Sequence, residues 1–219
     1  MKRIKKYLDT LNNDYDKKTK TVAFVSLAVT FLFALVNGFW GIYHASLWYG
    51  TMCIYYLIFV ILLGFIIVAD IKISRQDDRE HIRKKIYFAA SLVLLILNIS
   101  LIVPIALMVK MQRPVEMSLI PAIAVAAYTT YRITMAAINL KKRKKTTNIL
   151  FKLYRAVDFI DALVSVLILQ NTLVMVVSKR QEPQMLPLMA GTSAAIWIGI
   201  LLISVMTILR GINYIRRKM

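Results

Sequence analysis

The stretch that decides the fold is VAFVSLAVTFLFALVNGFWGIY at residues 22–43, followed after three residues by LWYGTMCIYYLIFVILLGFIIVA at residues 47–69. Each meets the length of roughly 20 mostly apolar residues that an α-helix needs to cross the hydrocarbon of a bilayer. Aromatic residues typical of a membrane–water interface flank the turn between them: Trp40, Tyr43, Trp48 and Tyr49. The two stretches therefore predict a transmembrane hairpin.

Four further apolar stretches follow the hairpin, at residues 87–109, 117–140, 157–178 and 186–209. All six are long enough to span. The sequence thus predicts an all-α membrane protein, a bundle of six transmembrane helices. In the last stretch Gly191, Ala195 and Gly199 recur at four-residue spacing, which predicts a face that another helix approaches closely.

The basic residues predict the orientation of the bundle. Of the 29 Lys and Arg residues, 24 lie in four segments on one side, at residues 1–20, 70–86, 141–156 and 210–219. The other side holds Lys110, Arg113, Lys179 and Arg180. Because short loops rich in Lys and Arg stay in the cytoplasm, we expect both termini to be cytoplasmic in a multi-pass protein of the cell (plasma) membrane.

We expect three regions along the chain: a basic amphipathic arm (residues 1–20), a transmembrane domain (21–210) and a basic cytoplasmic tail (211–219). The arm has apolar residues at helical spacing, which fits a helix lying on the inner leaflet. A solvated, frayed arm is the alternative. No secretory signal peptide is expected, since the first apolar stretch is too long for one.

Composition narrows the functional classes. The net charge of +18 sits in short loops at helix ends, so we expect these loops to contact anionic lipid headgroups and not nucleic acid. The sequence holds one cysteine and two histidines, which are too few ligands for a metal cluster built from Cys or His residues. No phosphate-binding loop, metalloprotease motif or nucleophile elbow is present, so we expect neither an enzyme nor a cofactor.

Three charged residues inside predicted spans are the candidate functional residues: Arg132, Asp158 and Asp161. Arg132 and Asp161 each lie nine residues from a basic helix end, about 13 Å at 1.5 Å per residue, so they have matching depths on consecutive antiparallel helices. Asp158 and Asp161 share a helix face. We predict that Arg132 pairs with Asp161, with Asp158 as the alternative partner. The pair is either a structural neutralisation or a carboxylate site that exchanges a proton or a cation.

Two segments resemble the transmembrane domain of the cation diffusion facilitator (cation efflux) family. The segment VNGFWG (36–41), with Ser46 and Leu47 after it, is similar to that family's first span and following turn, and LYRAVDFIDALVS (153–165) is similar to its fifth-span motif. The resemblance implies six helices, cytoplasmic termini, a homodimer and export of divalent metal ions against protons. The soluble carboxy-terminal domain of many members is not expected here.

The same resemblance implies that most metal ligands are missing. Asp161 takes the place of the fifth-span metal-binding aspartate, but Val157 stands where that motif has a histidine. The acidic pair of the second span falls near Cys53 and Leu57. Because Zn²⁺ requires four donors, we expect no metal site, and Cys53 is only a weak candidate ligand.

Two functions remain open at this point. The first is a transporter that moves a cation or small cationic solute, with Asp161 as the coupling carboxylate and Arg132 as its counter-charge. The second is a non-transporting membrane subunit or scaffold in which the pair of Arg132 and Asp161 is structural.

The orientation is directly testable. A cysteine introduced by Arg143→Cys should react with a membrane-impermeant thiol reagent only after the membrane is permeabilised, because residue 143 lies in a strongly basic segment. Labelling of intact cells would contradict the predicted orientation.

Overall fold

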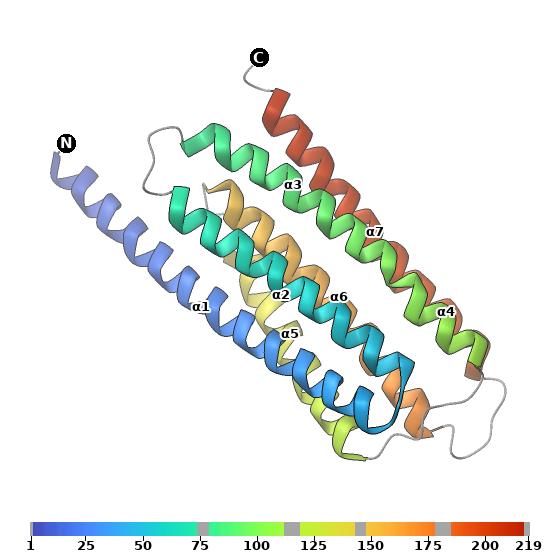
Figure 1. Cartoon of the computed structure of the whole chain (residues 1–219). Helices are drawn as coiled ribbons and strands as arrows, with labels where there is room; N and C mark the ends of the chain where they lie inside the picture. Colours follow the sequence, from blue (N-terminus) through green and yellow to red (C-terminus); the bar gives the residue numbers. More distant parts are fainter. Residues whose placement is uncertain (1, 74–78, 112–118, 143–147, 178–184, 217–219) are drawn as a thin grey trace.

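The computed structural model describes residues 2–73, 79–111, 119–142, 148–177 and 185–216. The elements of these segments are helices: α1 (Lys2–Tyr43), α2 (Leu47–Ile73), α3 (Arg79–Ser100), α4 (Ile102–Met111), α5 (Leu119–Lys142), α6 (Ile149–Val177) and α7 (Met185–Arg216). They run along one another in a long bundle with both chain ends at the same end (Figure 1). The expected all-α fold is confirmed for the described residues.

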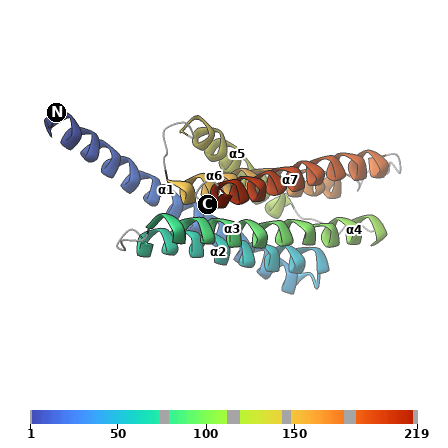
Figure 2. The ribbon, with the colours of Figure 1, turned by 90° about the horizontal axis from the view of Figure 1, so that it is seen from above.

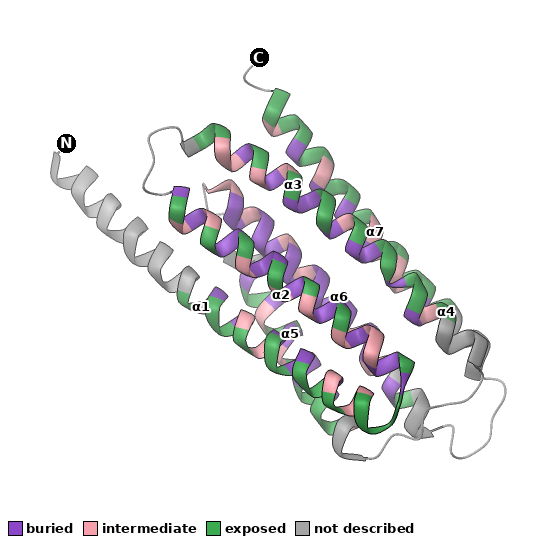
Figure 3. Ribbon diagram, in the orientation of Figure 1, coloured by how far each residue is buried: buried purple, intermediate pink, exposed green. Residues whose placement is uncertain are grey.

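Viewed from above, the helices form two layers. One layer contains α1, α2 and the α3–α4 unit, and the other contains α5, α6 and α7 (Figure 2). The closest-packed neighbours are α1 with α2, α5 with α6, and α3 with α7, while α6 also packs on α7. Buried residues concentrate on α2 and α6, and exposed residues follow the outer faces (Figure 3). The core therefore lies where α2 and α6 face each other across the layers.

The α1–α2 hairpin has a close helix contact and a tight turn. A Cβ atom added to Gly41 would lie 3.1 Å from the backbone N of Gly50, so the two backbones nearly touch there. At the end of α1, Ser46 N–H donates to Gly41 C=O at 3.0 Å and Ala45 N–H to Ile42 C=O at 3.3 Å, with Ala45 at a φ of 47°. This pairing is the Schellman motif, which satisfies the last carbonyls of a helix. The predicted turn at residues 44–46 thus has a clear physical basis.

The expected amino-terminal arm is a continuation of the first span. The backbone of α1 is helical without interruption from Lys2 to Tyr43, and the sequence has neither Pro nor Gly between residues 2 and 37. Nothing in this stretch introduces the kink that a separate surface helix would require.

The third predicted span is broken once. Helix α3 ends at Ser100 and α4 begins at Ile102, because Pro104 has no N–H to donate to the carbonyl of Ser100. The carbonyl of Asn98 instead accepts the indole N–H of Trp197 on α7 at 3.0 Å. The Asn98 side chain accepts from Tyr55 at 3.1 Å and donates to Ser204 at 2.8 Å. This break is therefore supported by polar contacts to α2 and α7.

The fifth predicted span begins about two turns earlier than the apolar pattern indicated. Helix α6 starts at Ile149, because the side-chain oxygen of Asn148 accepts the backbone N–H of Leu150 at 3.0 Å. Asparagine is a strong helix N-cap. Residues 149–156, expected in a loop, are helical.

Among the described residues, four helical segments are long and apolar enough to cross a membrane: Thr21–Tyr43, Leu47–Ile73, Glu80–Ala106 and Gly191–Arg216. The other two long helices, α5 and α6, carry the charged residues Arg132, Asp158 and Asp161.

The small residues of the last span do not pack inside the chain. A Cβ atom on Gly191 or Gly199 would meet no heavy atom within 4 Å. The close approach expected there is found instead between α1 and α2, at Gly41 and Gly50.

This contrast gives a stability prediction. Gly41→Ala should destabilise the protein by about 1–3 kcal/mol, because its new methyl group is overpacked against backbone that cannot rotate away. The matched control Gly199→Ala should change stability by no more than about 1 kcal/mol, since its methyl group enters open space and alanine favours the helix. Unfolding in detergent measures both, and equal effects would contradict the contact.

Candidate functional site: a buried arginine between two carboxylates

The structure brings together the three charged residues that the sequence analysis singled out. The guanidinium Nη2 of Arg132 on α5 lies 3.1 Å from Oδ1 of Asp158 and also contacts Oδ2 of Asp161, both on α6. The side chains are 0%, 1% and 0% exposed, in the same order. Arg132 is thus paired with Asp161, the predicted partner, and with Asp158 as well. We call these three residues the charge cluster.

Polar neighbours from two helices complete the charge cluster. Asn139, on α5, donates from Nδ2 to Oδ2 of Asp158 at 2.7 Å. The hydroxyl of Tyr128, also on α5, lies 3.4 and 3.3 Å from the two carboxylate oxygens of Asp161. Nη1 of Arg132 donates to the hydroxyl of Ser26 on α1. The charge cluster thus fastens α5 and α6 together and reaches α1.

The helical repeat explains why these side chains converge. Tyr128, Arg132 and Asn139 lie four and seven residues apart and so share one face of α5, while Asp158 and Asp161 share a face of α6. The sequence analysis identified the charges from their cost in a membrane. The same reasoning identified neither Asn139 nor Tyr128. Hydrogen-bonding residues at i−4 and i+7 from Arg132, on the same helix face, were the available signal for both.

Aromatic rings close one side of the charge cluster. The ring of Tyr128 stacks on Phe33 of α1 with centroids 3.9 Å apart and planes 2° apart. Tyr56 of α2 meets both rings edge-on, at centroid distances of 5.1 Å to Phe33 and 6.0 Å to Tyr128. All three residues are buried. The rings hold the Tyr128 hydroxyl beside Asp161 and leave little room for bulk water.

The charge balance decides what the charge cluster can do chemically. Two carboxylates face one guanidinium, so the three side chains carry one excess negative charge when all are ionised. An uncompensated charge in a low-dielectric interior is costly, and it is relieved by binding a proton or a cation. The arrangement is therefore suited to taking up one positive charge.

Two of the residues aligned with the metal positions, Cys53 and Val157, take part in helix packing. Cys53 packs against α1, where a Cβ atom on Gly38 would lie 3.0 Å from its Sγ. Val157 is fully buried in the apolar core. In the described part of the chain, no group of three or more His, Cys, Asp or Glu residues is placed to hold a metal ion. Cys53 is thus a packing residue of the hairpin.

Sequence reasoning missed a third buried carboxylate, outside the charge cluster. Asp70, near the end of α2, is only 3% exposed. Its Oδ1 accepts from Arg83 Nη2 at 3.3 Å and from Asn148 Nδ2 at 2.8 Å. An acidic residue where an apolar span meets a basic segment was the available signal, but its partners are 13 and 78 residues away in the chain.

Comparison of the chain with protein-family models, with curated proteins and with solved structures finds no match. The four apolar helices and the outward-facing apolar side chains are consistent with a multi-pass, α-helical integral membrane protein.

Because two carboxylates share the guanidinium of Arg132, we expect neutralising substitutions in the charge cluster to destabilise the protein by unequal amounts. Arg132→Met should destabilise the protein by about 3–5 kcal/mol, because it leaves two buried carboxylates without their cation. Asp161→Asn should cost about 1 kcal/mol or less, because a neutral pair of Arg132 and Asp158 remains. Unfolding in mixed micelles measures the difference.

The triple variant Arg132→Met, Asp158→Asn, Asp161→Asn serves as the control. It should recover most of the loss seen in Arg132→Met, since no buried charge is left unpaired. Equal destabilisation by Arg132→Met and Asp161→Asn would show that Asp158 does not share the guanidinium.

Proposed function

We propose that this chain is a six-span integral membrane protein of the cell membrane with both termini in the cytoplasm. Helices α1, α2, α5, α6 and α7, with α3 and α4 as one broken span, supply the six crossings. The shared position of both chain ends supports an even number of crossings, and the 24 basic residues on one side support the orientation (Figure 1).

Within that class, we propose a secondary transporter for a cation or small cationic solute, a divergent relative of the cation diffusion facilitator transmembrane domain. Asp161 is its coupling carboxylate and Arg132 its internal counter-charge. The observation that carries this proposal is the excess negative charge of the charge cluster, which one bound proton or cation offsets. The side chains are occluded from both sides, so the conformation described here corresponds to a closed intermediate between inward- and outward-facing states.

A scaffold or subunit without transport is the second candidate. The observation that favours it is the set of hydrogen bonds in which Asn139 and Tyr128 donate to the carboxylates and Ser26 accepts from Arg132, since these bonds stabilise the charge cluster as a structural contact between helices. In this case the basic segments bind anionic lipid headgroups. For either function we propose that the open face at Gly191 and Gly199 packs against a second copy of the chain in a homodimer. Catalysis is not part of either proposal.

Flux measurements separate the two functions. Purified protein in liposomes that enclose a pH-sensitive dye is exposed to outward or inward gradients of Na⁺, K⁺, Zn²⁺ or ethidium. For the transporter, at least one gradient should drive proton flux, and Asp161→Asn should reduce that flux at least ~10-fold because no carboxylate remains to exchange its charge. Glu80→Gln, which removes an exposed carboxylate paired with Lys84 on α3, should leave the flux unchanged.

Two outcomes contradict the transporter. Flux retained in a folded Asp161→Asn variant would remove that carboxylate from the coupling step. Flux equal to that of protein-free liposomes for every cation would favour the scaffold.

A further inference from the structure

One carboxylate joins three helices at the end of the bundle where both termini lie. Asp70 of α2 accepts from Arg83 of α3 and from Asn148, which caps the first turn of α6. Charge-assisted hydrogen bonds of this kind are stronger than neutral ones. The Arg83 side chain is 21% exposed and that of Asp70 is 4% exposed, so the contact forms a boundary between solvent and interior.

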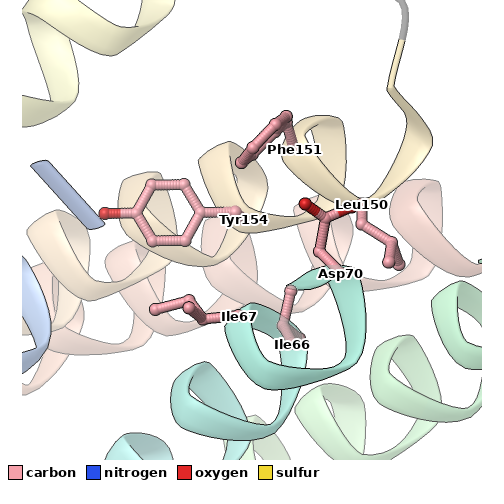
Figure 4. A pocket seen from close by; sticks show the side chains of 6 residues that line it. All are labelled: Ile66, Ile67, Asp70, Leu150, Phe151 and Tyr154. Atoms are coloured by element: carbon pink, nitrogen blue, oxygen red, sulfur yellow. The ribbon is translucent and has the colours of Figure 1, made fainter. Parts of the chain in front are cut away.

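A small cavity lies directly inside this contact. It is lined by Asp70 and by the apolar parts of Ile66, Ile67, Leu150, Phe151 and Tyr154, and its volume of about 10 Å³ holds roughly one water molecule (Figure 4). In Figure 4 the Asp70 carboxylate lies beside Leu150, while the Tyr154 hydroxyl points away from it along α6. The cavity is therefore an apolar space between the Asp70 contact and the interior.

The cavity and the charge cluster lie along the same helix, α6. Tyr154 precedes Asp158 by four residues, so both share one face of α6 about 6 Å apart along the axis. Asn148 precedes Asp158 by ten residues, about 15 Å along the same axis. The Asp70 contact, the cavity and the charge cluster thus follow one another along α6.

We propose that Asp70, Arg83 and Asn148 form a latch that controls access of water and cations to the charge cluster from the end of the bundle carrying both termini. When the latch opens, α2 separates from α3 and from the first turn of α6, and water enters through the apolar cavity. The Arg132 pairs between α5 and α6 stay intact during this step. The inference rests on the proposed function in taking the charge cluster as the site that must be reached.

Thiol accessibility tests the latch without any transport assay. In a Cys53→Ala background, Ile67→Cys places a reporter in the cavity wall, one turn inside Asp70. Inside-out membrane vesicles are treated with a sulfonated, membrane-impermeant methanethiosulfonate. Asp70→Asn should raise the modification rate at least ~10-fold, because loss of a buried charge-assisted contact increases the population of the locally open state. Arg83→Gln should give the same rise.

Matched controls distinguish opening of the latch from a general loss of helix packing in the bundle. Glu80→Gln, which breaks the neighbouring Lys84–Glu80 pair on α3 at its exposed carboxylate, should change the rate by less than ~2-fold, because a pair with so exposed a carboxylate contributes little. A second reporter, Leu97→Cys in the buried face of α3, should stay unreactive in all variants. Unchanged modification in Asp70→Asn, or an equal rise at both reporters, would overturn the latch.

The outcome is independent of the transport result. If Asp161→Asn retains flux while Asp70→Asn still opens the cavity, the proposed coupling residue is wrong and the latch stands. If Asp161→Asn abolishes flux while the Ile67→Cys reporter does not respond to Asp70→Asn, the latch is wrong and the transporter stands.

Discussion

The interior of this bundle depends on the sharing of one guanidinium by two carboxylates. Three charges at 0–1% exposure are stable only while they remain in contact, since removing one partner from a buried ion pair costs several kcal/mol. This constraint fixes the register of α5 against α6. Because Arg132 also donates to Ser26, it draws α1 toward the same point. A sliding motion of α6 by even one turn would separate the charges, so any conformational change must keep α5 and α6 together or hydrate the charge cluster.

The remaining helix contacts reflect how helices associate in lipid, where burial of apolar surface supplies little drive between them. The α1–α2 pair uses close backbone approach at Gly41 and Gly50. The contact of α3 with α2 and α7 uses the hydrogen bonds of Asn98. Large apolar side chains face outward instead, as Ile42 at 87% and Ile61 at 70% exposure illustrate. The bundle thus encloses its polar groups within an apolar core and turns further large apolar side chains outward.

The two buried acidic sites, the Asp70 contact and the charge cluster, differ in how easily they open. The Asp70 contact lies where the bundle meets solvent, and its partners Arg83 and Asn148 lie near the start of α3 and at the cap of α6, where helix ends open more easily than helix middles. The charge cluster lies deeper, between two long helices, and opens only at high cost. Because of this difference, opening at the Asp70 contact would let water approach the charge cluster from one end of the bundle while α5 and α6 stay together. A gated site requires this geometry.

The sequence by itself determined the features that depend on how far along its helix each residue lies. Apolar length predicted the helices, the spacing of basic segments predicted which ends lie together, and the matching depths of Arg132 and Asp161 indicated their contact. Only the tertiary structure decided what depends on rotation about each axis and on neighbours distant in the chain. It showed both aspartates on one arginine, the buried state of Asp70 and the open face at Gly199. The physical reason is that hydropathy and charge determine how deep each residue of a helix lies in the bilayer. The neighbours of a helix are determined instead by side-chain contacts with residues far away in the sequence, which the local sequence does not reveal.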